Sequence, residues 1–259
     1  MKPFPIVLSS IIVFLSSMVS PSSVEAFEKT VNLTAKDGTL ITAYWFDANH
    51  SDQNSKTTNT IILFHQAGAS AMGEYQSIIP KLTLTGLNVL AVDLRSGGDK
   101  FGGTNKTASA FEGKVPYCDA LPDMQASVEW VTKMHAKTKV IIWGSSYSAA
   151  AVFRIASENP YTINAVMGFS PASGDAMGNC KSEPYLDKVN MPAIAFRPST
   201  EMSYDSVIKQ SKVFAAHDIK YIEIPDGVHG SSMLVETRTK KDMSHAWKEV
   251  YSFLSPWTK

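Results

Sequence analysis

The stretch Val140-Ile141-Ile142-Trp143-Gly144-Ser145-Ser146-Tyr147-Ser148-Ala149-Ala150-Ala151 decides how the chain folds. It opens with a short apolar run rich in β-branched residues, which is typical of a strand buried inside a sheet. It ends in a run of alanines, which favours a helix. Between the two runs, small residues surround Ser146, as a sharp turn with strained backbone angles requires. The stretch therefore predicts a buried strand, a tight turn with Ser146 at its top, and a helix.

Apolar runs of strand length recur along the chain and alternate with helical patterns, as in a parallel sheet with crossover helices. We expect further buried strands at residues 60–64, 88–92 and 163–169, and strands at 192–196 and 220–224. We expect helices after residue 70 to near residue 85, and at 119–137, 149–158, 203–216 and 242–254. Near the start, Asp37-Gly38 joins two further strand-like segments and predicts a hairpin. The pattern indicates an α/β fold with a mostly parallel sheet.

Length, composition and charge indicate the class of protein and exclude one class of partner. The chain has 259 residues, of which 44% are hydrophobic, enough to bury one sizeable core. Its 24 Lys and Arg residues balance 24 Asp and Glu residues. No Lys/Arg block is concentrated enough to bind nucleic acid or anionic lipid. We therefore expect one α/β domain with no nucleic-acid partner.

Residues 1–26 have the features of a secretory signal peptide. Lys2 supplies a positive start, residues 6–19 form an apolar core, and Val24-Glu25-Ala26 places small residues at the two positions that a signal peptidase inspects. The apolar run is shorter than the roughly 20 residues of a membrane span. We expect a secreted or periplasmic mature domain, residues 27–259, without stable membrane insertion after cleavage.

Cys118 and Cys180 both belong to the mature chain. In an oxidising compartment an even pair of cysteines predicts one disulfide, and two buried free thiols are the alternative. A disulfide that closes a loop of this length lowers the conformational entropy of the unfolded chain. In the chain-entropy account this stabilises the folded state by about 4 kcal/mol. The sequence contains no Cys–His cluster with metal-ligand spacing, so we expect no metal site.

A long segment rich in Gly, Ser and Thr, residues 96–118, follows the strand predicted at 88–92. It therefore lies at the carboxyl edge of the sheet, where open α/β folds bind ligands. Its aromatic residues, Phe101, Phe111 and Tyr117, either line a substrate pocket or fix the loop to the core.

The turn around Ser146 resembles the nucleophile elbow of the α/β-hydrolases, G-x-S-x-G, with Ser148 in place of the last glycine. A serine hydroxyl needs a base, itself oriented by an acid, to act as a nucleophile near neutral pH. His229 stands in a Gly-rich loop after the last predicted strand, where this family carries its base. The resemblance spans essentially the whole mature chain. It implies a mostly parallel central sheet of about eight strands flanked by helices, with a minimal cap because the connection at 170–190 is short.

Three carboxylates are candidates for the acid. The family usually places Asp or Glu after the second-last predicted strand, and Glu201 is the first carboxylate there. Asp205 lies one helical turn further on, and Asp175 follows the preceding strand, a variant location. We choose Glu201. The chain order Ser146, Glu201, His229 is then the family order of nucleophile, acid and base.

The resemblance also implies an oxyanion hole. One donor would be the amide of Tyr147, directly after the nucleophile, and the other an amide of the loop that begins at His65, with Ala67 as the first choice. Such donors stabilise the charge that develops on the substrate carbonyl oxygen. Ser146 would form an acyl-enzyme with His229 as base, and no metal or organic cofactor is needed.

These features predict an exported serine hydrolase that cleaves an ester or related acyl bond of a small-molecule substrate. It is similar to the dienelactone hydrolases and small esterases of the family. Within the enzyme class, an aminopeptidase or thioesterase of the same fold is an alternative. A non-catalytic binding protein of the hydrolase fold and a cofactor-free peroxidase that uses the same serine are alternatives from other classes. The sequence carries no signal for the oligomeric state.

Overall fold

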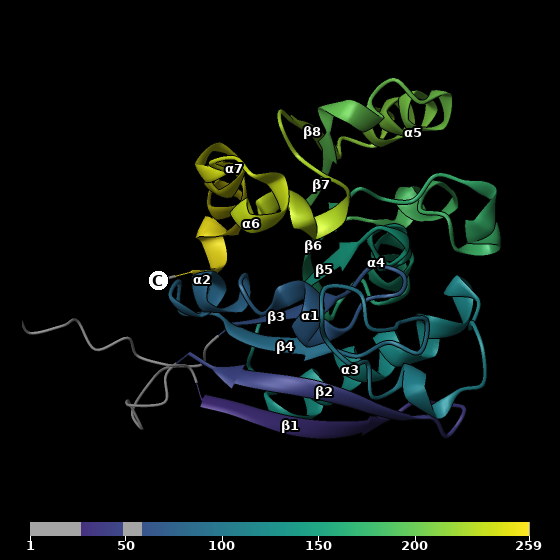
Figure 1. Cartoon of the computed structure of the whole chain (residues 1–259), viewed down its shortest axis with the longest axis vertical. Coiled ribbons are helices and arrows are strands. Elements are labelled where there is room, and N and C mark those ends of the chain that lie inside the picture. Colours follow the sequence, from purple (N-terminus) through teal and green to yellow (C-terminus); the bar gives the residue numbers. More distant parts are fainter. Residues whose placement is uncertain (1–26, 49–58, 259) are drawn as a thin grey trace, which may run out of the picture.

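The structure, a computed structural model, describes residues 27–48 and 59–258. Eight strands form one sheet in the order β1-β2-β4-β3-β5-β6-β7-β8, with helices on both sides (Figure 1). The predicted signal peptide, residues 1–26, lies outside the described residues. Within the described ranges, no helix combines the length and the apolar character needed to cross a membrane.

The strands are β1 (Phe27–Thr34), β2 (Leu40–Asp47), β3 (Thr60–Phe64), β4 (Asn88–Val92), β5 (Val140–Ser145), β6 (Ile163–Phe169), β7 (Ala193–Pro198) and β8 (Lys220–Ile224). The α-helices are α1 (Ala71–Tyr75), α2 (Ile79–Thr83), α3 (Leu121–Met134), α4 (Tyr147–Glu158), α5 (Asp205–Ala216), α6 (Glu236–Thr239) and α7 (Ser244–Leu254). The 3-10 helices are η1 (Ala108–Ala110), η2 (Tyr117–Ala120), η3 (Asp175–Cys180), η4 (Glu183–Lys188), η5 (Ser199–Glu201), η6 (Gly230–Leu234) and η7 (Ser255–Trp257).

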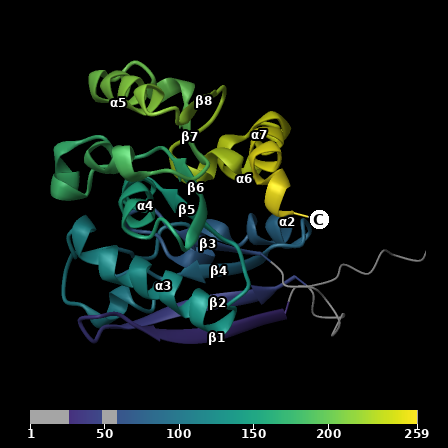
Figure 2. The ribbon, with the colours of Figure 1, turned by 180° about the vertical axis from the view of Figure 1, so that it is seen from behind.

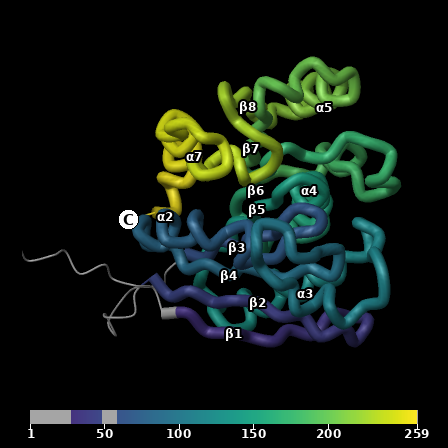
Figure 3. Tube along the Cα trace, in the orientation of Figure 1, coloured from purple at the N-terminus to yellow at the C-terminus, as the bar shows by residue number. Residues whose placement is uncertain are grey.

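The sheet is mostly parallel, as predicted. β1 and β2 form the expected antiparallel hairpin around Asp37-Gly38, and β2 pairs antiparallel with β4. All other neighbouring strands are parallel. Figure 3 shows β1 and β8 as the two outermost strands of the sheet. Because parallel strands have their carboxyl ends at one edge of the sheet, the loops after β3, β5, β7 and β8 converge there.

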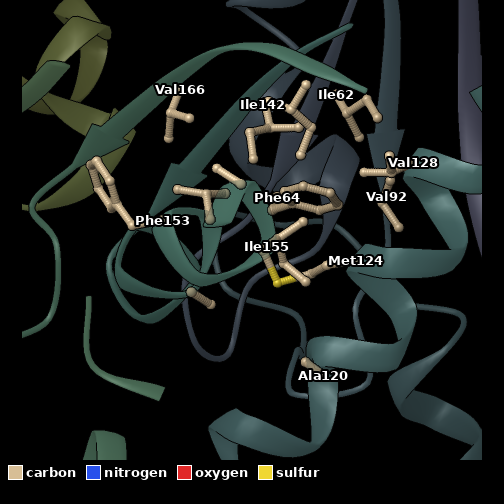
Figure 4. Close-up of a cluster of buried hydrophobic side chains, with 14 of the residues drawn as sticks. Ile62, Phe64, Val92, Ala120, Met124, Val128, Ile142, Phe153, Ile155 and Val166 are labelled. Atoms are coloured by element: carbon tan, nitrogen blue, oxygen red, sulfur yellow. The ribbon is translucent and has the colours of Figure 1, made fainter. Parts of the chain in front are cut away.

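Apolar side chains cover both faces of the sheet. On one face, β3, β5 and β6 pack against α3 and α4, and Figure 4 shows Phe64, Met124 and Phe153 in this layer. On the other face, the strands pack against α1, α2 and α7, so helices lie on both sides of the sheet in either view (Figures 1 and 2). Every residue of β3, β4 and β5 is buried, which explains why these strands are continuous apolar runs.

The predicted strands at 60–64, 88–92, 163–169 and 220–224 have the predicted bounds. The helix expected to reach residue 85 is instead two short helices, because Pro80 lies in the first turn of α2, where proline begins a helix rather than continues one. The helix expected at 119–137 spans Leu121–Met134, with Pro122 in its first turn. α4 begins two residues earlier than expected, and α5 and α7 begin two residues later.

Cys118 and Cys180 form the expected disulfide. It joins η2, at the end of the long segment after β4, to η3, in the connection after β6. Tyr117 of the long segment stacks on Tyr147 with ring centroids 4.9 Å apart, and the Arg95 guanidinium lies over the Phe111 ring. These two aromatic residues fix the loop to the domain. Phe101 is 38% exposed, and its ring centroid lies 3.9 Å from the Arg238 guanidinium.

Arg95 connects three segments of the chain. Its guanidinium forms ion pairs of 2.6 Å with Asp123 in α3 and with Asp37 in the hairpin turn. Asp123 is fully buried, whereas the Asp37 side chain is 43% exposed. A buried carboxylate that loses its cation is costly, because it has neither water nor a countercharge.

We therefore expect Arg95→Met to lower the free energy of unfolding by about 3–5 kcal/mol, since it leaves Asp123 buried without its partner. Urea unfolding at pH 7 measures the change. Asp37→Asn is the matched control, which removes the exposed pair and should cost about 1 kcal/mol or less. Equal losses in the two variants would contradict this interpretation.

His65 follows β3 and is fully buried. Its Nε2 accepts a hydrogen bond of 2.8 Å from the Leu94 amide, so the ring proton resides on Nδ1, which donates to the Gln66 carbonyl at 2.9 Å. Asn105 Nδ2 lies 3.0 Å from the same Nε2. His65 thus joins β3 to the loop after β4 as a neutral imidazole, and burial lowers its pKa to about 4.

This buried imidazole should make folding stability depend on pH. The unfolded chain takes up the His65 proton near pH 6.5 and the folded chain only near pH 4, so stability is lost as the pH falls through this window. The loss is at most about 1.4 kcal/mol per pH unit. His65→Gln should be less stable at pH 7 but should lose less stability between pH 7 and pH 4. Urea unfolding of both proteins at pH 7 and at pH 4 measures the two effects.

Candidate active site

Ser146 lies at the turn between β5 and α4, with φ 61° and ψ −116°. A non-glycine residue in such a conformation costs about 1–3 kcal/mol and persists only where the surroundings impose it. Gly144 shows what imposes it, because a Cβ atom there would lie 2.4 Å from the Ser148 carbonyl oxygen. The close approach of strand and helix therefore requires the small residues around Ser146.

Ser148, where the family pattern has glycine, is fully buried. Its hydroxyl accepts a hydrogen bond of 2.8 Å from the Ser145 amide. Its hydroxyl also lies 2.7 Å from the Phe64 carbonyl oxygen, to which it donates. The Ser148 hydroxyl therefore joins the turn to the end of β3. Serine fits here in place of the family's glycine because its hydroxyl has hydrogen-bond partners on both sides.

The structure brings Ser146, His229 and Glu201 together at the carboxyl edge of the sheet. His229 Nε2 lies 2.8 Å from Ser146 Oγ, and His229 Nδ1 lies 2.6 Å from Glu201 Oε1. Because the carboxylate accepts, Nδ1 carries the ring proton and Nε2 is free to accept from the serine hydroxyl. This is the arrangement that a serine needs for activation as a nucleophile.

Glu201 is held from its other side by Arg197, a residue to which the sequence analysis gave no role. Arg197 Nη1 donates to Glu201 Oε2 at 2.6 Å, and the same guanidinium donates to Gln210, to the Tyr221 hydroxyl and to the Pro171 carbonyl. Burial raises the pKa of Glu201, but the hydrogen bonds from His229 and Arg197 outweigh burial, and the pKa lies below its usual value. Arg197 lies four residues before Glu201, and this spacing between opposite charges is the sequence signal that could have identified the pair.

The other two candidate acids lie elsewhere. Asp205 is the exposed first residue of α5, and Asp175 pairs at 3.1 Å with Lys181 in an exposed turn. Among the described carboxylates, Glu201 is the one that forms an ion pair with His229.

The loop after His229 is fixed to the turn at Ser146. Gly230 has φ +69°, and a Cβ atom there would lie 2.4 Å from Ser145 Oγ. Its amide donates to Ser170 Oγ at 3.0 Å, and the next amide, of Ser231, donates to Ser145 Oγ at 2.9 Å. The turn that carries Ser146 and the loop that carries His229 therefore share the Ser145 hydroxyl as a contact point.

The two amides expected to bind an oxyanion belong to Ala67, in the loop after β3, and Tyr147, the first residue of α4. Over residues 27–48 and 59–258, neither amide donates a hydrogen bond to another group of the protein. The Tyr147 amide also lies at a helix N-terminus, where the backbone dipoles favour negative charge. The side chain of Tyr147 is buried, and burial raises its pKa well above the usual value.

Sequence reasoning also missed Glu74, a fully buried carboxylate of α1. It is hydrogen-bonded to Gln66 and to Ser145. Its side chain joins segments 71 residues apart, so no local spacing signals it. Within the part of the chain that the structure describes, no group of three or more His, Cys, Asp or Glu side chains could hold a metal ion.

Solved structures share this architecture. An esterase from Pyrococcus furiosus superposes with a TM-score of 0.67 at 17% identity, over 90% of this chain and 92% of that one. A dienelactone hydrolase from Anabaena variabilis gives 0.68 at 14% identity, over 91% and 100%. A protein from Xanthomonas campestris described as an α/β serine hydrolase without lid gives 0.64 at 13% identity, over 89% and 95%. At these identities the similarity shows the fold.

A comparison with curated protein sequences finds no match. Residues 55–218, more than half of the chain, match the family model described as "Serine aminopeptidase, S33". The described residues form no large cap over the carboxyl edge of the sheet. The chain therefore belongs to this serine aminopeptidase family of hydrolases and has the α/β-hydrolase fold.

Proposed function

We propose that the protein is a serine hydrolase that cleaves carboxylic ester or related acyl bonds, with Ser146 as nucleophile, His229 as base and Glu201 as acid. One observation carries the proposal. A continuous chain of two short hydrogen bonds runs from the Ser146 hydroxyl through the His229 ring to the Glu201 carboxylate. Family membership supports hydrolysis as the reaction class.

The proposed reaction has two halves. His229 Nε2 takes the proton of Ser146 Oγ as this oxygen attacks the substrate carbonyl carbon, and the amides of Ala67 and Tyr147 stabilise the oxyanion. The imidazolium then gives the proton to the leaving alcohol, and the C–O bond breaks to leave an acyl-enzyme. Water, deprotonated by His229, attacks the acyl carbonyl. The imidazolium then returns the proton to Ser146 Oγ as the bond between this oxygen and the acyl carbon breaks, which releases the acid and free Ser146.

Two details of this proposal come from other observations. The disulfide between Cys118 and Cys180 supports export to an oxidising compartment, because disulfides persist there and are rare in the cytosol. The description of the family model favours cleavage of an aminoacyl bond as a second candidate. The values of kcat/KM for short-chain esters and for aminoacyl amides, measured side by side, show which of the two bonds the enzyme cleaves.

We expect a fluorophosphonate to form one covalent adduct, on Ser146. The activated hydroxyl attacks phosphorus as it would attack a carbonyl carbon. Intact mass and peptide mapping of the purified mature protein locate the adduct. Ser146→Ala should remain unlabelled and inactive, whereas Ser145→Ala should still be labelled at Ser146. A folded wild-type protein without an adduct would exclude this function.

We expect Glu201→Gln to lower kcat by about 10⁴-fold, because an amide does not stabilise the imidazolium or hold the required tautomer. Asp205→Asn is the matched control, one helical turn further along the chain, and should keep wild-type activity. Steady-state kinetics with an ester substrate measures both variants. Full activity in Glu201→Gln would remove this residue as the acid.

A further inference from the structure

Glu74 of α1 lies at the junction of the loops that form the site. Its Oε2 accepts a hydrogen bond of 2.6 Å from the Gln66 amide. Its Oε1 accepts from Ser145 Oγ at 2.6 Å and from Gln66 Nε2 at 3.1 Å. The side chain is fully buried, so these three donors replace the water that a carboxylate would otherwise bind.

The residues that Glu74 binds are neighbours of the proposed oxyanion donors. Gln66 immediately precedes Ala67, and Ser145 lies two residues before Tyr147. The carboxylate therefore bridges the two segments whose amides must lie a fixed distance apart to bind one oxygen atom. Ser145 Oγ in turn accepts from the Ser231 amide at 2.9 Å, which brings the loop of His229 into the same network.

The network is directional. Ser145 Oγ receives the Ser231 amide hydrogen, so its own hydrogen is available for Glu74 Oε1. Lys100 Nζ donates to Gln66 Oε1 at 2.9 Å, which leaves the Gln66 amide group to donate to Glu74. All three partners are therefore donors toward the carboxylate. A glutamine at this place would put an NH₂ group against at least one of them.

Arg238 supplies positive charge near Glu74 without binding the carboxylate. Its Nη1 donates to the Glu74 carbonyl oxygen and its Nη2 to the Gly73 carbonyl oxygen. The carboxylate oxygens thus remain available for the two loops. A buried carboxylate is costly. The hydrogen bonds that offset this cost go to Gln66 and Ser145, in the two segments of the proposed oxyanion hole.

We propose that Glu74 is a positioning residue, which sets the separation of the Ala67 and Tyr147 amides and thereby the stabilisation of the tetrahedral intermediate. The inference rests on the proposed function. Because the substrate ground state depends less than the intermediate on these amides, a loss of Glu74 should lower kcat and change KM little. Substitution of a single oxyanion donor can cost 10²- to 10³-fold, and a misplaced pair of donors should cost somewhat less.

The test compares Glu74→Gln with the wild-type protein in steady-state ester hydrolysis and in binding of phenylboronic acid, whose serine adduct is tetrahedral like the intermediate. We expect kcat to fall by about 30- to 100-fold and KM to stay within about threefold. The affinity for phenylboronic acid should fall by a similar factor to kcat. A purely structural role would not link these two losses.

Two further variants keep the test decisive. Ser145→Ala removes only the shared hydroxyl, so it should lower kcat in the same manner, by about tenfold, even if Glu74→Gln folds poorly. The double variant should lose less than the product of the single losses, because both substitutions disrupt the hydrogen bond between Ser145 and Glu74. Asp123→Asn is the control: it weakens a buried carboxylate that binds Arg95, and it should lower thermal stability while kcat stays near the wild-type value.

The outcomes separate the two proposals. A wild-type protein that does not react with a fluorophosphonate would overturn the proposed function, and the role of Glu74 with it. A reactive wild-type protein, together with unchanged kcat in folded Glu74→Gln and Ser145→Ala, would overturn the role of Glu74 alone. A lower kcat with unchanged affinity for phenylboronic acid would overturn it as well.

Discussion

The site depends on the close approach of β5 and α4 at the turn that carries Ser146. The turn leaves no room for a side chain at Gly144 and holds Ser146 at positive φ. At this turn the Ser146 hydroxyl lies 2.8 Å from His229 Nε2, and α4 begins at the next residue, Tyr147. The conformation is unfavourable in isolation, so the buried strands on either side and the hydroxyl of Ser148 must maintain it.

Buried polar groups, more than apolar packing, set the positions of the loops at this edge. His65 joins β3 to the segment after β4, Arg197 holds Glu201, and Glu74 joins the loop after β3 to the turn. Each of these groups is costly to bury and has its hydrogen bonds satisfied by backbone or side-chain partners. Hydrophobic packing tolerates small shifts, whereas such networks have one satisfied arrangement. The loops therefore have defined positions although few of their residues belong to regular secondary structure.

The fold could be predicted from the sequence because buried parallel strands are continuous apolar runs with clear ends. Ser146 follows such a run, Glu201 follows β7, and His229 follows the more exposed strand β8. The parallel order brings the carboxyl ends of these strands to one side of the sheet. The interruption between α1 and α2 depended on where Pro80 falls within a turn, which hydrophobic periodicity does not reveal. Arg197 and Glu74 could not be assigned roles, because their partners are defined by tertiary contacts. The choice among the three acids likewise required the distance to His229.

The disulfide has a consequence for how the protein is made. Cys118 and Cys180 lie in the two segments that follow β4 and β6 at the carboxyl edge of the sheet, and the bond links these segments covalently. The sheet itself does not include either cysteine. A chain synthesised in a reducing cytoplasm would therefore lack the covalent link between these two segments. Recombinant production should pass through an oxidising compartment, so that the Cys118–Cys180 disulfide is formed in the preparation used for substrate profiling.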